Sequence, residues 1–206
     1  MRITRILLNE HRIIEQVLNC LERMADRCEF YGRLENRPAR DAIAFLRSFV
    51  ERCHDRKVET RLIPVIQATG VPVEQFPGCP LRQSRKDARL HLDAMEAVIE
   101  PACAGSAPAL DRFAEHARAY IDVLLDCIAR QEDCLFPLFE EAARDADGVL
   151  PESGDRECGG YSACNNYIEV ANALAEQFGV PRAVVTASGD GVEGRAGAGS
   201  WRKTNR

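Results

Sequence analysis

The 206-residue sequence lacks the features that mark several common classes of protein. No apolar run approaches the length of a membrane span, and the first apolar stretch meets polar residues by position 9, too soon for a signal-peptide core. No basic cluster accompanies the net charge of -5, which argues against a nucleic-acid surface. The sequence therefore favours a cytoplasmic protein that binds neither membranes nor nucleic acid.

Catalytic signatures and closely paired cysteines are missing as well. The chain has no Ser-His-Asp order, no phosphate-binding loop and no dinucleotide fingerprint, so the sequence favours a protein that is not an enzyme. None of the nine cysteines forms a Cys-x-x-Cys pair, which argues against a zinc ribbon and against a thioredoxin motif. In a reducing compartment these cysteines should be thiols.

Strand signals are also missing, and apolar residues instead recur at helical spacing. This spacing predicts long helices over about 3–29, 38–68, 82–103 and 109–145, and a shorter helix over about 161–178. Four long helices joined by short loops predict an all-α fold, an antiparallel up-down four-helix bundle, with the fifth helix packed outside it.

Composition divides the chain into three parts. Residues 1–145 form the predicted bundle, and residues 146–180 hold a glycine-rich loop and the accessory helix that packs on it. Residues 181–206 are rich in Gly, Ala and Ser and end in basic residues, so we expect a flexible tail there.

One segment of the chain occurs twice, with an offset of 73 residues. Residues 53–64 align with residues 126–137, and this repetition predicts two helical hairpins related by pseudo-twofold symmetry. At one aligned position His54 meets Cys127, so the two halves offer a metal different ligands. The other aligned pairs include Lys57 with Arg130, Glu59 with Glu132, Leu62 with Leu135 and Pro64 with Pro137, and both prolines should kink their helices.

Several short stretches within about residues 5–145 carry a resemblance to a known family. They are Asn9-Glu-His-Arg-Ile-Ile14, Glu51-Arg-Cys-His-Asp-Arg-Lys-Val-Glu59, Leu62-Ile-Pro64, Gly70-Val-Pro72, and Ala119-Tyr120 through Leu124-Leu125 to Leu135-Phe-Pro137. In these stretches the chain resembles the hemerythrin-like (HHE cation-binding) family. The resemblance implies a four-helix bundle with a non-haem di-iron or similar centre, in a protein that binds dioxygen, senses oxygen or redox state, or handles iron.

The family pattern places His on helix 1, His-x-x-x-Glu on helix 2, His on helix 3 and His-x-x-x-Glu on helix 4. His11 and His54 match the first two histidines. The first glutamate position holds Val58, and Glu59 follows one residue later, about 100° further round the helix. The chain therefore departs from the family where a bridging carboxylate is expected.

The second half departs further from the pattern. On helix 4, Cys127 stands at the histidine position and Gln131 at the glutamate position, with Glu132 one residue later. A thiolate ligand shifts the preference toward zinc or a sulfur-tolerant iron site. On helix 3 two registers stay open, because His91 is the only histidine there, whereas an ungapped match puts Arg85 at the ligand position.

We therefore predict a modified site for non-haem iron or zinc, linked to oxygen or redox sensing or to iron handling. Its partners would be the metal ion and dioxygen or another small diatomic, and a homodimer or a regulatory protein partner stays open. The candidate ligands are His11, His54, Glu59, His91, Cys127 and Glu132.

Two alternatives need no metal. The first is a helical bundle that has closed over a vacated site and acts as a regulatory or scaffold protein through a partner. The second is a thiol redox protein, in which Cys158 and Cys164 lie close along a loop and form a reversible disulfide.

Overall fold

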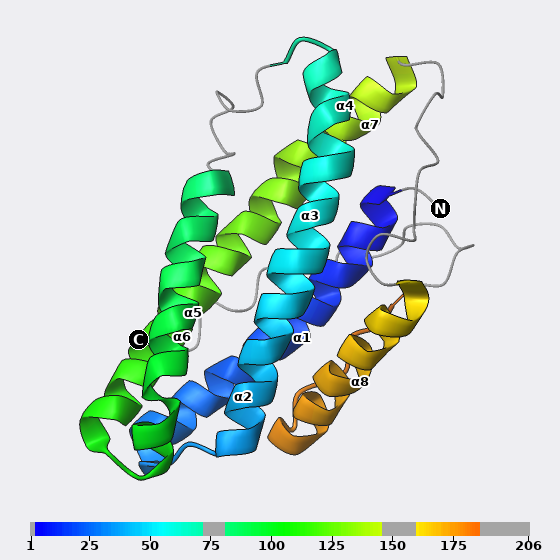
Figure 1. Ribbon diagram of the computed structural model, residues 1–206. Coiled ribbons are helices and arrows are strands. Elements are labelled where there is room, and N and C mark those ends of the chain that lie inside the picture. The colour runs from blue at the N-terminus through cyan, green and yellow to red at the C-terminus, as the bar shows by residue number, and fades with distance from the viewer. Residues whose placement is uncertain (1–2, 72–80, 146–159, 186–206) are drawn as a thin grey trace.

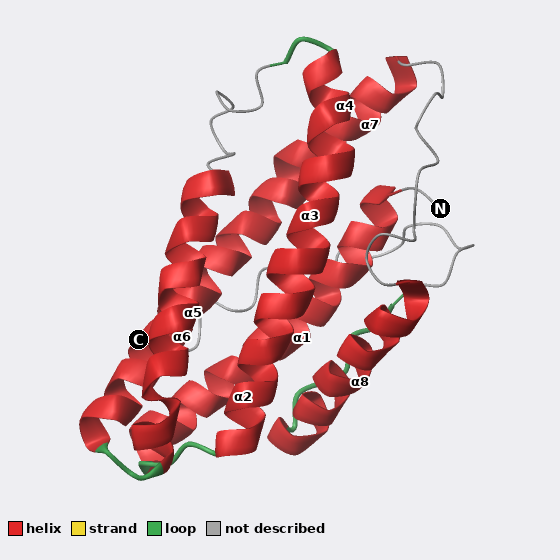
Figure 2. Ribbon diagram, in the orientation of Figure 1, coloured by secondary structure: helices red, strands yellow, loops and turns green. Residues whose placement is uncertain are grey.

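A computed structural model of the protein describes residues 3–71, 81–145 and 160–185 (Figure 1). Every regular element in these ranges is a helix, which confirms the predicted all-α class (Figure 2). Over the same ranges, no helix combines the length and the apolar character that a membrane crossing requires. The predicted loop over 146–159 and most of the predicted tail lie outside the described residues.

The first half of the chain contains two long helical segments. Helix α1, Ile3–Tyr31, ends where Gly32 takes the positive φ of 60° that glycine adopts at little cost. The second segment is continuous but changes its winding along its length. It consists of α2 (Asn36–Phe45), η1 (Leu46–His54), α3 (Asp55–Lys57), η2 (Val58–Leu62) and α4 (Ile63–Ala68), of which η1 and η2 are π-helical.

The second half repeats this arrangement. Its first segment is a single helix, and its second segment is again interrupted by a π-helical turn. The elements are α5 (Leu81–Cys103), α6 (Ala107–Arg130), η4 (Gln131–Leu135) and α7 (Phe136–Asp145). Helix α8, Gly160–Phe178, follows after the undescribed loop.

The π turns η2 and η4 lie 73 residues apart, the offset of the sequence repeat, and each ends just before the residue that precedes a proline. Pro64 and Pro137 lack an N–H, and their rings crowd the carbonyl four residues back. A wider turn before each proline relieves this crowding. At the two prolines where kinks are predicted from sequence, the structure has a preceding π turn.

Several pairs of helices pack against each other. Helix α6 packs against α5 and α1, α2 packs against α5, and α4 packs against α7. Helix α8 packs against α1 and α2 (Figure 1). The chain after α8 stays on α1, where Arg12 donates to the carbonyl of Val184 and the Ala183 N–H donates to Gln16.

Two apolar clusters divide the interior along the helices. The larger cluster fills most of the interior. The smaller cluster lies beside the start of α1, at the turns η2 and η4 and the helices that follow them. Between them lie buried polar residues from three segments: Glu10 and His11, His54, and Gln131. The members of the smaller cluster are Leu7, Val58, Leu62, Ile66, Leu135, Phe136 and Phe139.

Candidate metal centre

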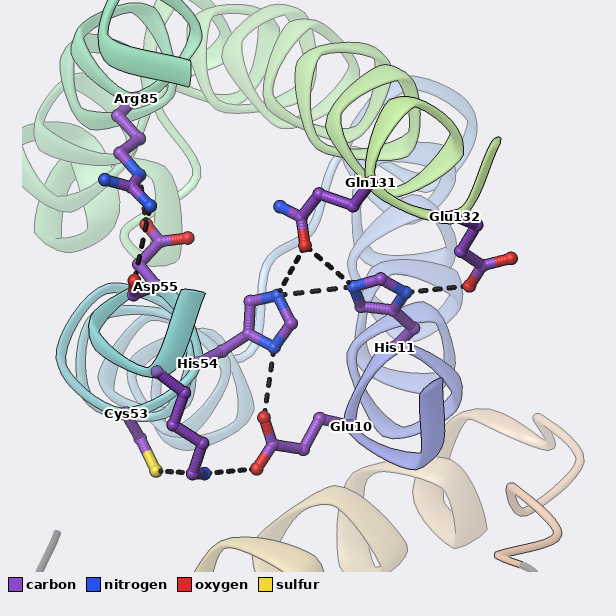
Figure 3. Close-up of polar contacts among 9 residues, drawn as sticks. Glu10, His11, Cys53, His54, Asp55, Arg85, Gln131 and Glu132 are labelled. Carbon is purple, nitrogen blue, oxygen red and sulfur yellow. Dashed lines mark hydrogen bonds and ion pairs between the residues drawn. The ribbon is translucent and has the colours of Figure 1, made fainter. Parts of the chain in front are cut away.

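The candidate site is a compact triangle of polar atoms (Figure 3). Along the sequence its residues fall between members of the two apolar clusters. His11 comes from α1, His54 from the end of η1 and Gln131 from the start of η4. The Nε2 atoms of the two histidines lie 3.3 Å apart, and each lies 3.1 Å from Oε1 of Gln131. All three residues are buried, so solvent does not satisfy these atoms.

A carboxylate contacts the outer nitrogen of each imidazole. Nδ1 of His11 lies 2.7 Å from Glu132, and Nδ1 of His54 lies 3.1 Å from Glu10. Because a carboxylate only accepts hydrogen bonds, each Nδ1 carries a proton and donates it. The other nitrogen of a neutral imidazole then has a lone pair, so each ring directs a lone pair from Nε2 at the triangle when that ring is neutral.

The environment keeps His11 in this neutral form. Burial lowers the pKa of His11 below its ordinary value of 6.5 and the proximity of His54 lowers it further, which outweighs the opposing hydrogen bond to Glu132. If His54 is neutral as well, three electron-rich atoms face one another with no proton between them. A bound cation, a proton shared by the imidazoles, or a rotation of the Gln131 amide removes this conflict.

The spacing of the three atoms suits a transition metal. Two ligands with bonds of about 2.05 Å lie about 2.9 Å apart at a right angle and about 3.4 Å apart at the tetrahedral angle. The observed separations of 3.1 and 3.3 Å fall between these values. No group of three His, Cys, Asp or Glu side chains placed to hold a metal occurs in the described part of the chain, so the third donor here is an amide oxygen.

A lysine holds the carboxylate that orients His54. The ammonium of Lys57 forms a close ion pair with Glu10 and lies 3.1 Å from Sγ of Cys53. Burial alone would raise the pKa of Glu10, but its contacts with His54 and Lys57 bring that pKa below the ordinary 4.5. Burial alone would lower the pKa of Lys57, but Glu10 raises it well above the usual value. The pair is therefore ionised at neutral pH.

The π turn η4 explains how two consecutive residues contact one imidazole. In a regular α-helix neighbouring side chains point about 100° apart. Here Gln131 contacts Nε2 of His11 and Glu132 contacts Nδ1 of the same ring. At the equivalent turn η2, Val58 is fully buried among apolar side chains, and Glu59 turns away to pair with Arg85. The two turns share their winding but not their contacts.

A cavity of about 140 Å³ adjoins the triangle on the side of His54 and Gln131. Arg85 lies on its wall, forms an ion pair with Asp55 at 3.1 Å and also pairs with Glu59. Burial raises the pKa of Asp55 above its ordinary value, and Arg85 opposes that rise. The other residues that line the cavity are Ile14, Val50, Glu51, Ser84, Ala88, Arg89, Tyr120, Leu124, Cys127 and Ile128.

The cysteines predicted to take part in the chemistry are placed differently from one another. Cys127 lies on the cavity wall, and burial raises the pKa of its thiol, which favours the thiol over the thiolate that binds metals. Residue Cys158 and the side chain of Cys164 lie outside the described part of the structure.

The third helix contributes Arg85 rather than His91 to this region. Nδ1 of His91 lies 3.0 Å from Nδ1 of His116, between α5 and α6, and neither residue lines the cavity. Sequence analysis had left both registers open, and it is Arg85, the residue of the ungapped match, that lies beside the cavity.

The structure therefore brings His11, His54 and Glu132 together, places Cys127 and Glu59 on the adjoining cavity, and leaves His91 in a separate pair. Sequence analysis did not select Glu10 or Gln131 for the site. A signal existed for both, because Glu10 directly precedes His11 and Gln131 occupies the glutamate position of the family pattern.

Comparison of the chain with protein-family models, with curated proteins and with solved structures finds no match. The hemerythrin-like resemblance therefore depends on the residues themselves, namely His11, His54 and the stretches around them.

Proposed function

We propose that the protein is a hemerythrin-like antiparallel up-down four-helix bundle that binds a non-haem metal ion, iron or zinc. In support, the four long segments α1, α2–α4, α5 and α6–α7 follow one another in the expected order. Equivalent π turns also repeat at the offset of the sequence repeat. The role we infer is oxygen or redox sensing, or iron handling.

The observation that carries the proposal is the convergence of three lone pairs. Nε2 of His11, Nε2 of His54 and Oε1 of Gln131 lie within 3.3 Å of one another, with both Nδ1 protons directed away to carboxylates. Two imidazoles and one amide oxygen suit iron(II) or zinc and leave coordination positions open. Bound iron would supply reactivity toward dioxygen or oxidants.

The surrounding residues have positioning roles. Glu132 and Glu10 fix the tautomer and the ring orientation of the two histidines, as carboxylates do around metal-bound imidazoles. Lys57 neutralises Glu10 and keeps its carboxylate in place. Removal of any of these groups should weaken metal binding without removing a ligand.

A bundle without metal is the second candidate, and one observation favours it. A half-turn of the Gln131 amide puts its NH2 group opposite both Nε2 atoms, where it can donate one hydrogen bond to each. The site would then be satisfied with no cation. Such a protein would act as a regulatory or scaffold bundle through a protein partner.

Metal analysis of protein purified without oxygen and without chelators separates the two candidates. We expect about one iron or zinc per chain, and a melting temperature that falls when a chelator removes it, because a ligand that binds only the folded state stabilises it. His54→Ala should lose both the metal and the chelator effect. His116→Ala, which alters the other histidine pair, is the matched control and should keep both.

Wild-type protein that takes up no metal after reconstitution with iron(II) or zinc would exclude the metal site and favour the metal-free bundle. The same conclusion would follow if His54→Ala retained as much metal as His116→Ala.

A further inference from the structure

The cavity beside the triangle reaches from the surface to the proposed metal ligands. At its outer side, Arg89 and Glu59 are 63% and 54% exposed, whereas Tyr120 and Gln131 at its inner side are 1% and 3% exposed. Because His54 and Gln131 line this cavity, a molecule inside it would lie next to the metal. The inference below rests on the proposed metal centre.

One buried hydrogen-bond donor on the cavity wall has no acceptor within the described residues. Nε of Arg85 forms no hydrogen bond there, although Asp55 lies 3.1 Å away as an ion-pair partner. The amide nitrogen of Gln131 points away from both imidazoles, toward the side of Asp55 and Arg85 (Figure 3). When Oε1 binds a metal, the amide cannot rotate and this N–H group stays directed at the cavity.

The hydroxyl of Tyr120 is a third donor on the same wall. Burial, with the charges of Asp55 and Glu51 nearby, raises the pKa of Tyr120 well above its ordinary value, so the hydroxyl keeps its proton. A buried donor that stays unpaired costs stability, so Nε of Arg85 favours a ligand that accepts hydrogen bonds.

The charges and the volume of the cavity narrow the class of ligand. Three carboxylates, Glu51, Asp55 and Glu59, face two guanidinium groups, which gives a formal charge of -1, and a divalent metal changes this to +1. One negative charge on a ligand would balance that sum. A volume of 140 Å³ is close to that of a cavity that holds benzene, about 150 Å³, so the ligand is a small molecule.

We propose that the cavity binds a small monoanionic oxyanion of the formate, acetate or bicarbonate type, held beside the metal by Arg85, Gln131 and Tyr120. One oxygen of the anion faces the open side of the metal centre, and the other accepts hydrogen bonds from the wall.

Cobalt(II) provides the test, because its visible spectrum reports its ligands. Full-length protein loaded with cobalt(II) would be titrated with formate, and we expect a saturable spectral change. Tyr120→Phe removes a single hydroxyl and should weaken formate binding about tenfold. Tyr167→Phe is the matched control, since Tyr167 packs on Phe45 and Phe49 rather than on the cavity, and it should bind formate as the wild type does.

A second variant tests the anion site independently of Tyr120. Arg85→Lys keeps the positive charge opposite Asp55 and Glu59 but removes Nε, so it should also weaken formate binding.

Two results would overturn the inference while leaving the metal centre intact. One is a normal cobalt spectrum that formate does not change, and the other is equal formate affinity in Tyr120→Phe and Tyr167→Phe. If no cobalt spectrum develops at all, the proposed metal centre itself fails, and the anion site fails with it.

Discussion

The turns η2 and η4 occupy equivalent positions in the sequence repeat and have the same winding, but their side chains make different contacts. Both are five-residue π turns, and they lie 73 residues apart in the sequence. Each is followed by an α-helix whose second residue is a proline. At η4 the first two side chains, Gln131 and Glu132, contact His11. At η2 the corresponding residues are Val58, which joins the smaller apolar cluster, and Glu59, which pairs with Arg85 at the surface.

This difference shows that the backbone of the repeat and the chemistry of the site are set separately. The prolines fix the wide turns in both halves. The side chains at the first position of each turn then decide whether the adjoining interior is polar or apolar. Equivalent substitutions on the two turns should therefore have unequal effects, and three aligned pairs test this.

The largest difference should come from a glutamate placed at the first position of each turn. In metal-free protein, Val58→Glu puts a carboxyl group among fully buried apolar side chains and should lower the free energy of unfolding by about 3–5 kcal/mol. Gln131→Glu should cost less than about 1 kcal/mol, because either neighbouring imidazole can take a proton and pair with the new carboxylate. Urea unfolding followed by circular dichroism measures both.

Gln131→Glu should also tighten metal binding, since a carboxylate is a stronger ligand than an amide. Equal losses of stability in Val58→Glu and Gln131→Glu would contradict the idea that the two turns face different interiors.

The next pair is Lys57 and Arg130, which align in the repeat. Lys57→Met leaves the buried carboxylate of Glu10 with His54 as its remaining partner and should cost about 2–3 kcal/mol at neutral pH. Arg130 is half-exposed and pairs with Asp126 one turn away on the same helix, so Arg130→Met should cost below about 0.5 kcal/mol. Urea unfolding of both variants at pH 7 measures this difference.

The cost of Lys57→Met should depend on pH in a defined direction. The pKa of Glu10 lies below 4.5 in the folded protein, so its stabilising contribution is present above pH 4.5 and is lost as the pH falls through the folded pKa. The deficit of Lys57→Met relative to wild type should therefore be full at pH 7 and shrink below pH 4.5. A deficit that stays constant over this range would show that Lys57 acts through packing alone.

The parts of the molecule that could be predicted from sequence are those that follow from local pattern. Apolar spacing predicted the helices to within a few residues, and the repeat predicted the equivalence of the turns at Pro64 and Pro137. His11 and His54 were selected from their positions in the family pattern, and the structure brings them together.

The remaining contacts depend on geometry that no local pattern encodes. Regular helical spacing put Glu132 about 100° away from the ligand position. The π turn lets it share His11 with Gln131. The chain of contacts from Lys57 through Glu10 to His54 joins separate helices, so it becomes visible only when α1 and the second helical segment are packed together.

The smallest difference should come from the second position of each turn. Glu132→Gln keeps the shape of the side chain but weakens the hydrogen bond that holds Nδ1 of His11. Loss of such an outer partner typically lowers metal affinity by 10- to 100-fold, and because Glu132 is 39% exposed we expect about tenfold. Glu59→Gln alters an exposed ion pair with Arg85, so zinc affinity should change less than about twofold and stability by less than about 0.5 kcal/mol.

Competition with a chromogenic chelator measures zinc affinity in both variants, with wild type as reference. A large loss in Glu132→Gln and none in Glu59→Gln would mean that only η4 supports the metal through an outer hydrogen bond. Similar losses in both variants would instead mean that Glu59 leaves Arg85 when metal binds and turns toward His54. In that case the two turns would act alike, and the asymmetry between them would belong to the metal-free protein alone.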